Sequence, residues 1–156
     1  MNKNKELLMN KALAQAAIAL KHGEVQVGAI IVDSKEQIIA RGYNQIEKKA
    51  CQLAHAEAIA IQKACKKRGD WRLDGCWIYI TLEPCLMCMG LIKLSRINGI
   101  VFGAHSSLFG SGLADLEKVP NYTRGISIEG GCKKQQSIAL LQAFFKHVRK
   151  KRKDYR

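Results

Sequence analysis

The segment from Tyr79 to Gly90, YITLEPCLMCMG, most narrows what this chain can fold into. An apolar run typical of a β-strand is followed at once by a proline and by two cysteines three residues apart. Pro84 suits the first turn of a helix, where its missing N–H costs nothing. Cys85 and Cys88 would then lie one turn apart on one face of the helix start. The segment therefore predicts a strand-to-helix junction that carries two neighbouring thiols.

A thiol pair at a helix start has several uses. The unpaired N–H groups and the positive end of the helix dipole lower thiol pKa values, which favours thiolate metal ligands. The same spacing describes a thioredoxin-type redox pair. A disulfide framework belongs to secreted domains, but the N-terminal apolar stretch is interrupted by Gln15 and is followed by no cleavage pattern. We therefore expect a reducing, cytoplasmic location, with the cysteines as thiols or metal ligands.

Strand-like and helix-like segments alternate along the chain. We expect strands at 27–33, 37–44, 76–82, 97–104 and 125–131, and helices at 6–22, 53–69, 84–95 and 131–156. The first two strands, separated by a polar turn, are expected to form a hairpin. This order predicts one α/β domain over residues 1–156, in which a sheet lies between layers of helices. The loop at 105–123 is long enough to lie over a site.

The charge of the chain indicates a polyanionic partner. Twenty-six Lys and Arg residues face thirteen Asp and Glu residues, a formal net charge of +13. Because neutralising phosphates releases counterions, such an excess favours nucleic acid over a membrane surface, and we expect no membrane span. The tail at about 146–156 holds seven of the cations, and a second cluster comprises Lys63, Lys66, Lys67 and Arg68.

A second stretch, LAHAEAIA, decides between the uses of the thiols. His55 stands thirty positions before Cys85, at the expected start of a helix. One imidazole and two thiolates are suitable ligands for zinc and leave a fourth position open. Water in an open position becomes a nucleophile near neutral pH. Glu57 would lie beside that water as a general acid and base.

Cys51, four residues before His55, offers a different zinc site. If its loop folds inward, Cys51, His55, Cys85 and Cys88 would form a closed, structural Cys₃His site without catalysis. That arrangement leaves Glu57 without a role, so the open site is the favoured interpretation. The other cysteines, Cys65, Cys76 and Cys132, are expected to be buried thiols, and Met87 and Met89 to be core residues.

Together, HAE and PCLMC form the H-x-E…P-C-x-x-C signature of zinc-dependent base deaminases. The likeness extends through EVQVGAIIVD, ARGYN, LAHAEAIAI, TLEPCLMCMG, SRINGIVFGA and FFK, so the chain resembles the bacterial tRNA-specific adenosine deaminases. This resemblance implies a three-layer α/β/α sandwich of the cytidine-deaminase type with a central mixed sheet, and a homodimer. It also implies one zinc ion per subunit on His55, Cys85 and Cys88, with Glu57 as the proton shuttle. The implied reaction converts the wobble adenosine of an arginine tRNA anticodon to inosine.

The same resemblance implies which residues contact the substrate. They are Asn44, which closes ARGYN, then His105 and Ser106 in the loop after VFGA, and Phe145 in the last helix. Two positions depart from the family pattern. Gln26 replaces a proline near the site, and Ser106 stands where an acidic residue is usual, in a loop that also lacks the family's lysine. The expected zinc ligands are unaffected by either change.

Two other functions fit the same residues. One is deamination of free nucleosides, nucleotides or guanine at the same zinc centre, although a net charge of +13 brings a small-molecule enzyme little advantage. The other is a non-catalytic, zinc-stabilised RNA-binding module. Product formation and the effect of Cys51 on zinc binding distinguish these hypotheses from the tRNA deaminase.

Overall fold

The protein is built around a five-stranded sheet with the strand order β2-β1-β3-β4-β5. The structure, a computed structural model, describes residues 3–107, 110 and 123–154. The strands are β1 (Gly28–Val32), β2 (Ile38–Tyr43), β3 (Trp77–Leu82), β4 (Gly99–Ala104) and β5 (Ser127–Glu129). β1 pairs antiparallel with both β2 and β3, whereas β3, β4 and β5 run parallel. The sheet is therefore mixed, as expected.

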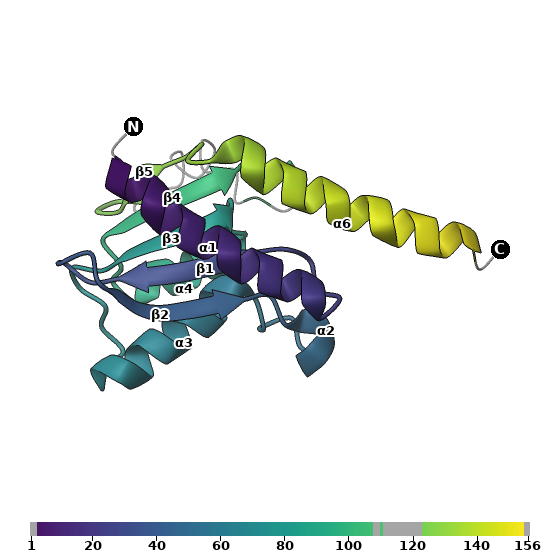
Figure 1. Cartoon of the computed structure of the whole chain (residues 1–156). Coiled ribbons are helices and arrows are strands. Elements are labelled where there is room, and N and C mark those ends of the chain that lie inside the picture. Colours follow the sequence, from purple (N-terminus) through teal and green to yellow (C-terminus); the bar gives the residue numbers. More distant parts are fainter. Residues whose placement is uncertain (1–2, 108–109, 111–122, 155–156) are drawn as a thin grey trace.

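Helices cover both faces of this sheet (Figure 1). α1 (Lys3–Lys21) and α6 (Lys134–Asp154) lie on one face, and α3 (Ala56–Arg68) and α4 (Leu86–Leu94) lie on the other. The C-terminal half of α6 extends beyond the sheet (Figure 1). The predicted three-layer α/β/α arrangement is confirmed.

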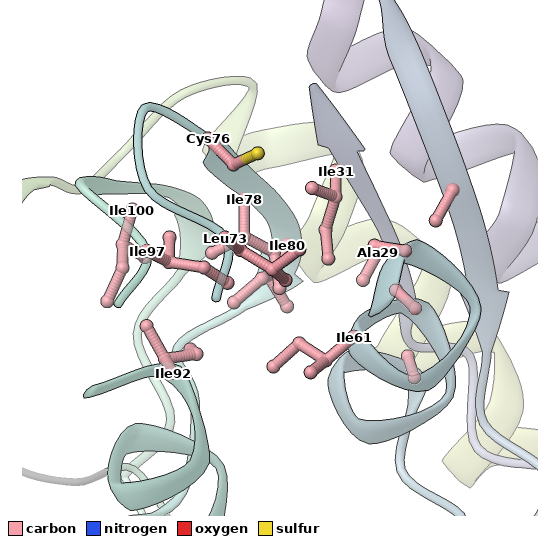
Figure 2. Close-up of a cluster of buried hydrophobic side chains, with 14 of the residues drawn as sticks. Ala29, Ile31, Ile61, Leu73, Cys76, Ile78, Ile80, Ile92, Ile97 and Ile100 are labelled. Atoms are coloured by element: carbon pink, nitrogen blue, oxygen red, sulfur yellow. The ribbon is translucent and has the colours of Figure 1, made fainter. Parts of the chain in front are cut away.

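The core consists of two apolar clusters, one on each face of the sheet. Along β1, Ile31 packs with the α3 and α4 cluster, whereas Ile30 and Val32 pack with α1. Figure 2 shows the first cluster, in which Ile31, Ile78 and Ile80 of the strands meet Ile61 and Ile92 of the helices. Successive strand side chains point to opposite faces, so a strand buried on both sides needs the continuous apolar sequence that β1 has.

Two glycines allow helices to lie directly against the sheet. A Cβ atom at Gly42 would lie 2.3 Å from the carbonyl oxygen of Ala56 and 2.9 Å from the nitrogen of Ala60. A Cβ atom at Gly28 would lie 2.1 Å from the carbonyl oxygen of Ala12 on the other face. The contact at Gly42 sets the position of the first turn of α3.

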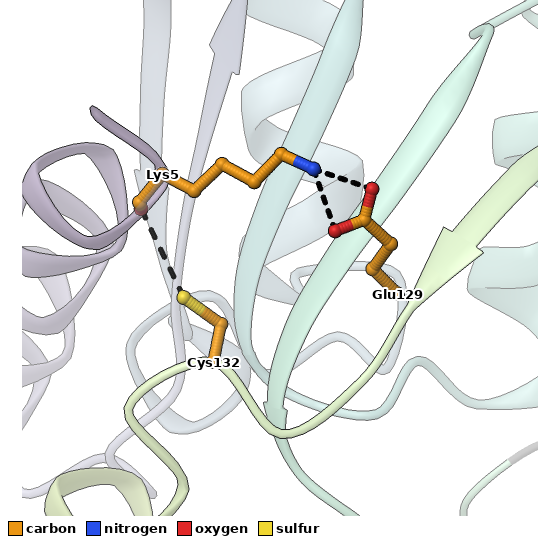
Figure 3. A network of polar contacts seen from close by, with 3 residues as sticks. All are labelled: Lys5, Glu129 and Cys132. Atoms are coloured by element: carbon orange, nitrogen blue, oxygen red, sulfur yellow. Dashed lines mark hydrogen bonds and ion pairs between the residues drawn. The ribbon is translucent and has the colours of Figure 1, made fainter. Parts of the chain in front are cut away.

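A polar network attaches the start of α1 to the segment between β5 and α6 (Figure 3). Lys5 Nζ donates to both carboxylate oxygens of Glu129, at 2.5 and 2.6 Å. The Cys132 thiol donates to the carbonyl oxygen of Lys5 at 3.9 Å. Because both charged side chains of the pair are partly exposed, it contributes at most about 1 kcal/mol to stability.

The expected elements are all present, with ends that differ from the expected ones by up to three residues, and two differences lie close to the expected site residues. The helix expected at 84–95 begins at Leu86, so Pro84 precedes it and Cys85 is its N-cap residue. The polar stretch after Asn44 contains a short helix that was not expected, α2 (Ile46–Lys49). Within the described part of the chain, no helix is long and apolar enough to cross a membrane. Of the expected loop at 105–123, residues 108–109 and 111–122 lie outside the described residues.

We predict that Gly42→Ala destabilises the protein by about 2 kcal/mol, because the added methyl group overlaps the backbone of α3. Gly23→Ala is the matched control, since Gly23 has a φ of 69° but no atom within 4 Å of an added Cβ. The control should lose only the cost of a left-handed residue, about 1 kcal/mol. Urea denaturation measures both, and equal losses would contradict the close approach of α3 to β2.

Candidate metal centre

Two helices on the same face of the sheet begin at an expected metal ligand. His55 is the N-cap residue of α3, with φ −69° and ψ 152°, and Cys85 is that of α4, with φ −72° and ψ 170°. Neither side chain forms the hydrogen bond that usually caps its own helix. Both side chains are therefore available for a shared site, which receives the positive ends of two helix dipoles.

The three expected ligands meet at this point. His55 Nδ1 lies 3.6 Å from Cys88 Sγ and 3.8 Å from Cys85 Sγ. The ligand atoms of these three residues all lie within 4.8 Å of one another. Tetrahedral zinc with ordinary bond lengths separates nitrogen and sulfur ligands by about 3.6 Å. The arrangement therefore fits a zinc ion.

The electrostatics of the two sulfurs also suit a divalent cation. Hydrogen bonds from the Cys88 thiol and from His55 lower the pKa of Cys85 to about 4. The contact with Cys85, together with burial, raises the pKa of Cys88. The hydrogen bond with Cys85 also raises the pKa of His55. Cys85 is thus a thiolate at neutral pH, and metal binding displaces the proton of the Cys88 thiol.

Glu57 lies beside this cluster without belonging to it. It occupies the first turn of α3 and is only 4% exposed. Burial raises the pKa of its carboxyl to about 7, and its side chain interacts with Cys88. A carboxyl with such a pKa can accept and release protons near neutral pH.

The closed Cys₃His site is wrong. Cys51 is exposed and lies outside the group of three metal ligands that the described residues form. The six cysteines all lie in the described part of the chain and are free, so Cys85 and Cys88 form no disulfide. His55, Cys85 and Cys88 would supply three ligands to a zinc ion, which would leave a fourth coordination position for water or substrate.

Comparisons with known proteins agree with this chemistry. Residues 2–104 match the family model of the cytidine and deoxycytidylate deaminase zinc-binding region. The chain belongs to this deaminase family. A curated relative, the tRNA-specific adenosine deaminase of Bacillus subtilis (strain 168), is 41% identical over 150 residues, covering 95% of this chain and 92% of the relative.

Solved structures show the same fold. One comes from a study of A-to-I editing by tRNA:A34 deaminases at the wobble position of transfer RNA. It is 33% identical, with a TM-score of 0.80, and the match covers 86% of this chain and 99% of that chain. A guanine deaminase from Bacillus subtilis is also 33% identical, with a TM-score of 0.63 over 74% of this chain and 75% of its own. The fold and the zinc site of this deaminase are thus established, and its substrate is considered below.

Asn44 and Gln26 carry buried side-chain amides on neighbouring segments, because Asn44 donates its N–H to the carbonyl oxygen of Val27, the residue after Gln26. Asn44 directly follows β2, and the next residue, Gln45, donates its N–H to the carbonyl oxygen of Ala54, the residue before His55. Asn44 Oδ1 is buried and accepts no hydrogen bond from the described residues. Gln26 is 1% exposed, and neither polar atom of its amide has a described partner. A buried amide without a partner is costly, which makes Asn44 a good candidate for binding a ligand.

The other expected substrate residues lie on the surface of this deaminase. His105 and Ser106 follow β4, and Ser106 donates its N–H to Glu83. Phe145 is 48% exposed on α6 and packs edge-on against Phe144. Sequence reasoning missed Glu83, although an acidic residue between an apolar strand and Pro84 was a usable signal.

The expectations for the remaining sulfur residues hold for Cys76, Cys132 and Met89 but not for Cys65 and Met87. Cys76 and Cys132 are buried, and Cys65 is half-buried. Met89 is fully buried as expected, but Met87 is 39% exposed. The core prediction for Met87 was wrong because its position on α4 faces away from the sheet.

We predict that Cys88→Ser lowers bound zinc to below about a tenth of one ion per chain, since the loss of a thiolate removes one of three ligands. Cys51→Ser is the matched control and should retain about one zinc ion, because Cys51 lies outside the ligand cluster. Elemental analysis after dialysis against a weak chelator measures both. Zinc loss in Cys51→Ser would restore the closed site.

Proposed function

We propose that this deaminase converts adenosine to inosine at the wobble position of a tRNA anticodon, and that the tRNA is an arginine tRNA. The observation that carries the reaction class is the cluster of His55, Cys85 and Cys88 with the buried Glu57 beside it but outside the ligand set. The names of the relatives and of the solved structure support tRNA as the substrate.

The proposed chemistry assigns Glu57 every proton transfer. When bound, zinc supplies Lewis-acid activation of a water molecule as the nucleophile. Glu57 accepts a proton from the attacking water and delivers it to the ring nitrogen next to C6. It then takes the second proton to the departing amine, so that water and adenosine give inosine and ammonia. The pKa of about 7 suits a carboxyl that must act as both base and acid.

The substrate proposal also follows from charge and accessibility. The bases of an anticodon loop are single-stranded, so one of them can enter a pocket without opening a duplex. Asn44, His105, Ser106 and Phe145 are proposed to contact the nucleotides around the target base. The cations on the outer half of α6, among them Lys146, Lys150 and Lys151, are exposed and suit phosphate groups.

We further propose that the enzyme is a cytoplasmic homodimer. Three large apolar side chains of α4 are exposed, with Leu94 at 75%, Leu86 at 56% and Met87 at 39%. An exposed apolar helix face of this kind suits the interface with a second copy. The six free cysteines are consistent with a reducing compartment.

A second candidate is deamination of a free base such as guanine. It is favoured by the structural likeness to a guanine deaminase from Bacillus subtilis at a TM-score of 0.63. The same metal centre would serve either substrate. The tRNA proposal is preferred because the excess of 13 positive charges suits a polyanion and is of little use for a neutral base.

Incubation with an anticodon stem-loop should raise the mass of the RNA by about one dalton, since an amino group is replaced by an oxygen. Glu57→Gln should retain its zinc and lose about 10²- to 10⁴-fold in turnover, because the shuttle is removed and the ligands remain. Mass spectrometry measures the product, and ammonia release is compared with guanine and cytidine. Turnover of guanine with an unchanged stem-loop would favour the second candidate, and full activity of Glu57→Gln would refute its role.

The pKa of Glu57 also predicts how metal-free protein responds to pH. Since folding raises this pKa from 4.5 to about 7, its favourable contribution is complete below about pH 4.5 and is lost as the pH rises through 7. The loss should be on the order of 3 kcal/mol in the wild type. Glu57→Gln should lack this loss, so its stability relative to wild type should rise between pH 5 and pH 8. Urea denaturation in the presence of a chelator measures the difference, and parallel curves would contradict the assigned pKa.

A further inference from the structure

One buried carboxylate near the metal centre has no part in the chemistry above. Glu83 is 6% exposed and stands two residues before Cys85, at the end of β3. Its own N–H donates to the carbonyl oxygen of Ala104 at 2.8 Å, which continues the pairing of β3 with β4. Burying a carboxylate costs free energy unless hydrogen bonds compensate that cost, so the partners of Glu83 indicate its role.

Several contacts of its side chain are with the segment that follows β4. Glu83 Oε2 accepts the N–H of Ser106 at 3.1 Å and lies 3.3 Å from His105 Nδ1. A Cβ atom at Gly110 would lie 2.7 Å from the same oxygen. The N–H of Gly110 also donates to the carbonyl oxygen of Ser106, so Gly110 and Ser106 both lie beside the carboxylate.

The contact with Glu83 gives His105 a defined orientation. With Nδ1 facing the carboxylate, the proton belongs on Nδ1, and the opposite ring edge with Nε2 is turned away from Glu83. The ring also packs edge-on against Phe102, with 4.9 Å between the ring centroids. The side chain of His105 is nonetheless 64% exposed. An imidazole held on one edge and exposed on the other can bind a ligand at little cost in side-chain entropy.

We propose that Glu83 is a positioning residue that holds His105 and Ser106 in place to bind the RNA strand next to the target base. Glu83 and Cys85 belong to one short junction, so the same backbone sets both the metal centre and this part of its rim. The Nε2 atom of His105 and the hydroxyl of Ser106 then offer hydrogen bonds to ribose or phosphate groups. This inference rests on the proposed function, since it requires an RNA substrate.

A purely structural role for Glu83 makes different predictions. A residue that only stabilised the junction would affect zinc content and unfolding, whereas a positioning residue changes RNA affinity while zinc is retained. The direct readout is therefore binding without turnover. Glu57→Gln supplies an inactive background in which the dissociation constant of an anticodon stem-loop is measured by fluorescence anisotropy.

In that background, Glu83→Ala should weaken stem-loop binding about tenfold, the usual value for one hydrogen bond to a charged group. Zinc should stay near one ion per chain. Glu83→Gln keeps an oxygen that can accept the Ser106 N–H, so it should recover part of the affinity. In the active enzyme, Glu83→Ala should raise KM for the stem-loop with a smaller change in kcat. Unchanged RNA affinity in Glu83→Ala would overturn the proposal.

A second variant tests the same contact while Glu83 is kept. Gly110→Ala places a methyl group 2.4 Å from the carbonyl oxygen of Ser106 and 2.7 Å from Glu83 Oε2. It therefore disturbs the contact between these two residues and should also weaken RNA binding, even where Glu83→Ala does not fold. Asp33→Asn is the control, since Asp33 accepts the N–H groups of Lys35 and Gln37 in the β1–β2 turn. This turn lies next to the start of β3, whereas Glu83 follows the end of β3. The RNA affinity of Asp33→Asn should be unchanged.

Normal RNA affinity in Gly110→Ala, or zinc loss in both Gly110→Ala and Glu83→Ala, would overturn the positioning role. The failure of the proposed function is recognised separately. In that case the wild type itself produces no inosine and binds the stem-loop no better than an unrelated hairpin of equal length.

Discussion

The convergence of two helix N-termini at one edge of the sheet is the constraint on which the rest of this structure depends. His55 and Cys85 are N-cap residues of α3 and α4, and Cys88 follows one turn later. For their ligand atoms to meet, the N-termini of both helices must lie at fixed positions on the same face of the sheet. The contact of Gly42 with the backbone of α3 sets the position of α3, and the short junction from β3 through Pro84 sets the position of α4. Small changes in helix packing therefore act directly on the metal centre.

The same convergence explains the perturbed titration of the site. Hydrogen bonds from the Cys88 thiol and from the His55 imidazole favour a thiolate at Cys85, whereas the buried Glu57 is held away from water and its pKa rises to about 7. A carboxyl in such surroundings reduces the stability of the metal-free protein and is useful only beside a reacting substrate. The free energy of unfolding is therefore smaller than it would be with an apolar side chain in place of Glu57. Burial of the apolar clusters on the two faces of the sheet offsets this cost.

The surface around the site combines two kinds of support. Exposed cations lie on α6, a helix that projects beyond the sheet (Figure 1). They attract phosphate groups without requiring a particular geometry. The contacts of Glu83 with His105 and Ser106 are short-range and directional. The first kind of interaction brings a polyanion to the protein, and the second can orient it at the metal centre.

The sequence by itself determined the alternation of strands and helices, the three zinc ligands and the position of Glu57. These features depend on periodicity and on short fixed spacings, which are local properties of the chain. Only the tertiary structure decided that Cys51 lies outside the ligand cluster, that α4 begins at Leu86 with Cys85 as its N-cap residue, and that Met87 is exposed. Only the tertiary structure, too, joined Glu83 to His105 and Ser106 across more than twenty residues. Burial and hydrogen bonding between distant segments depend on how the helices pack against the sheet, and no local pattern contains that information.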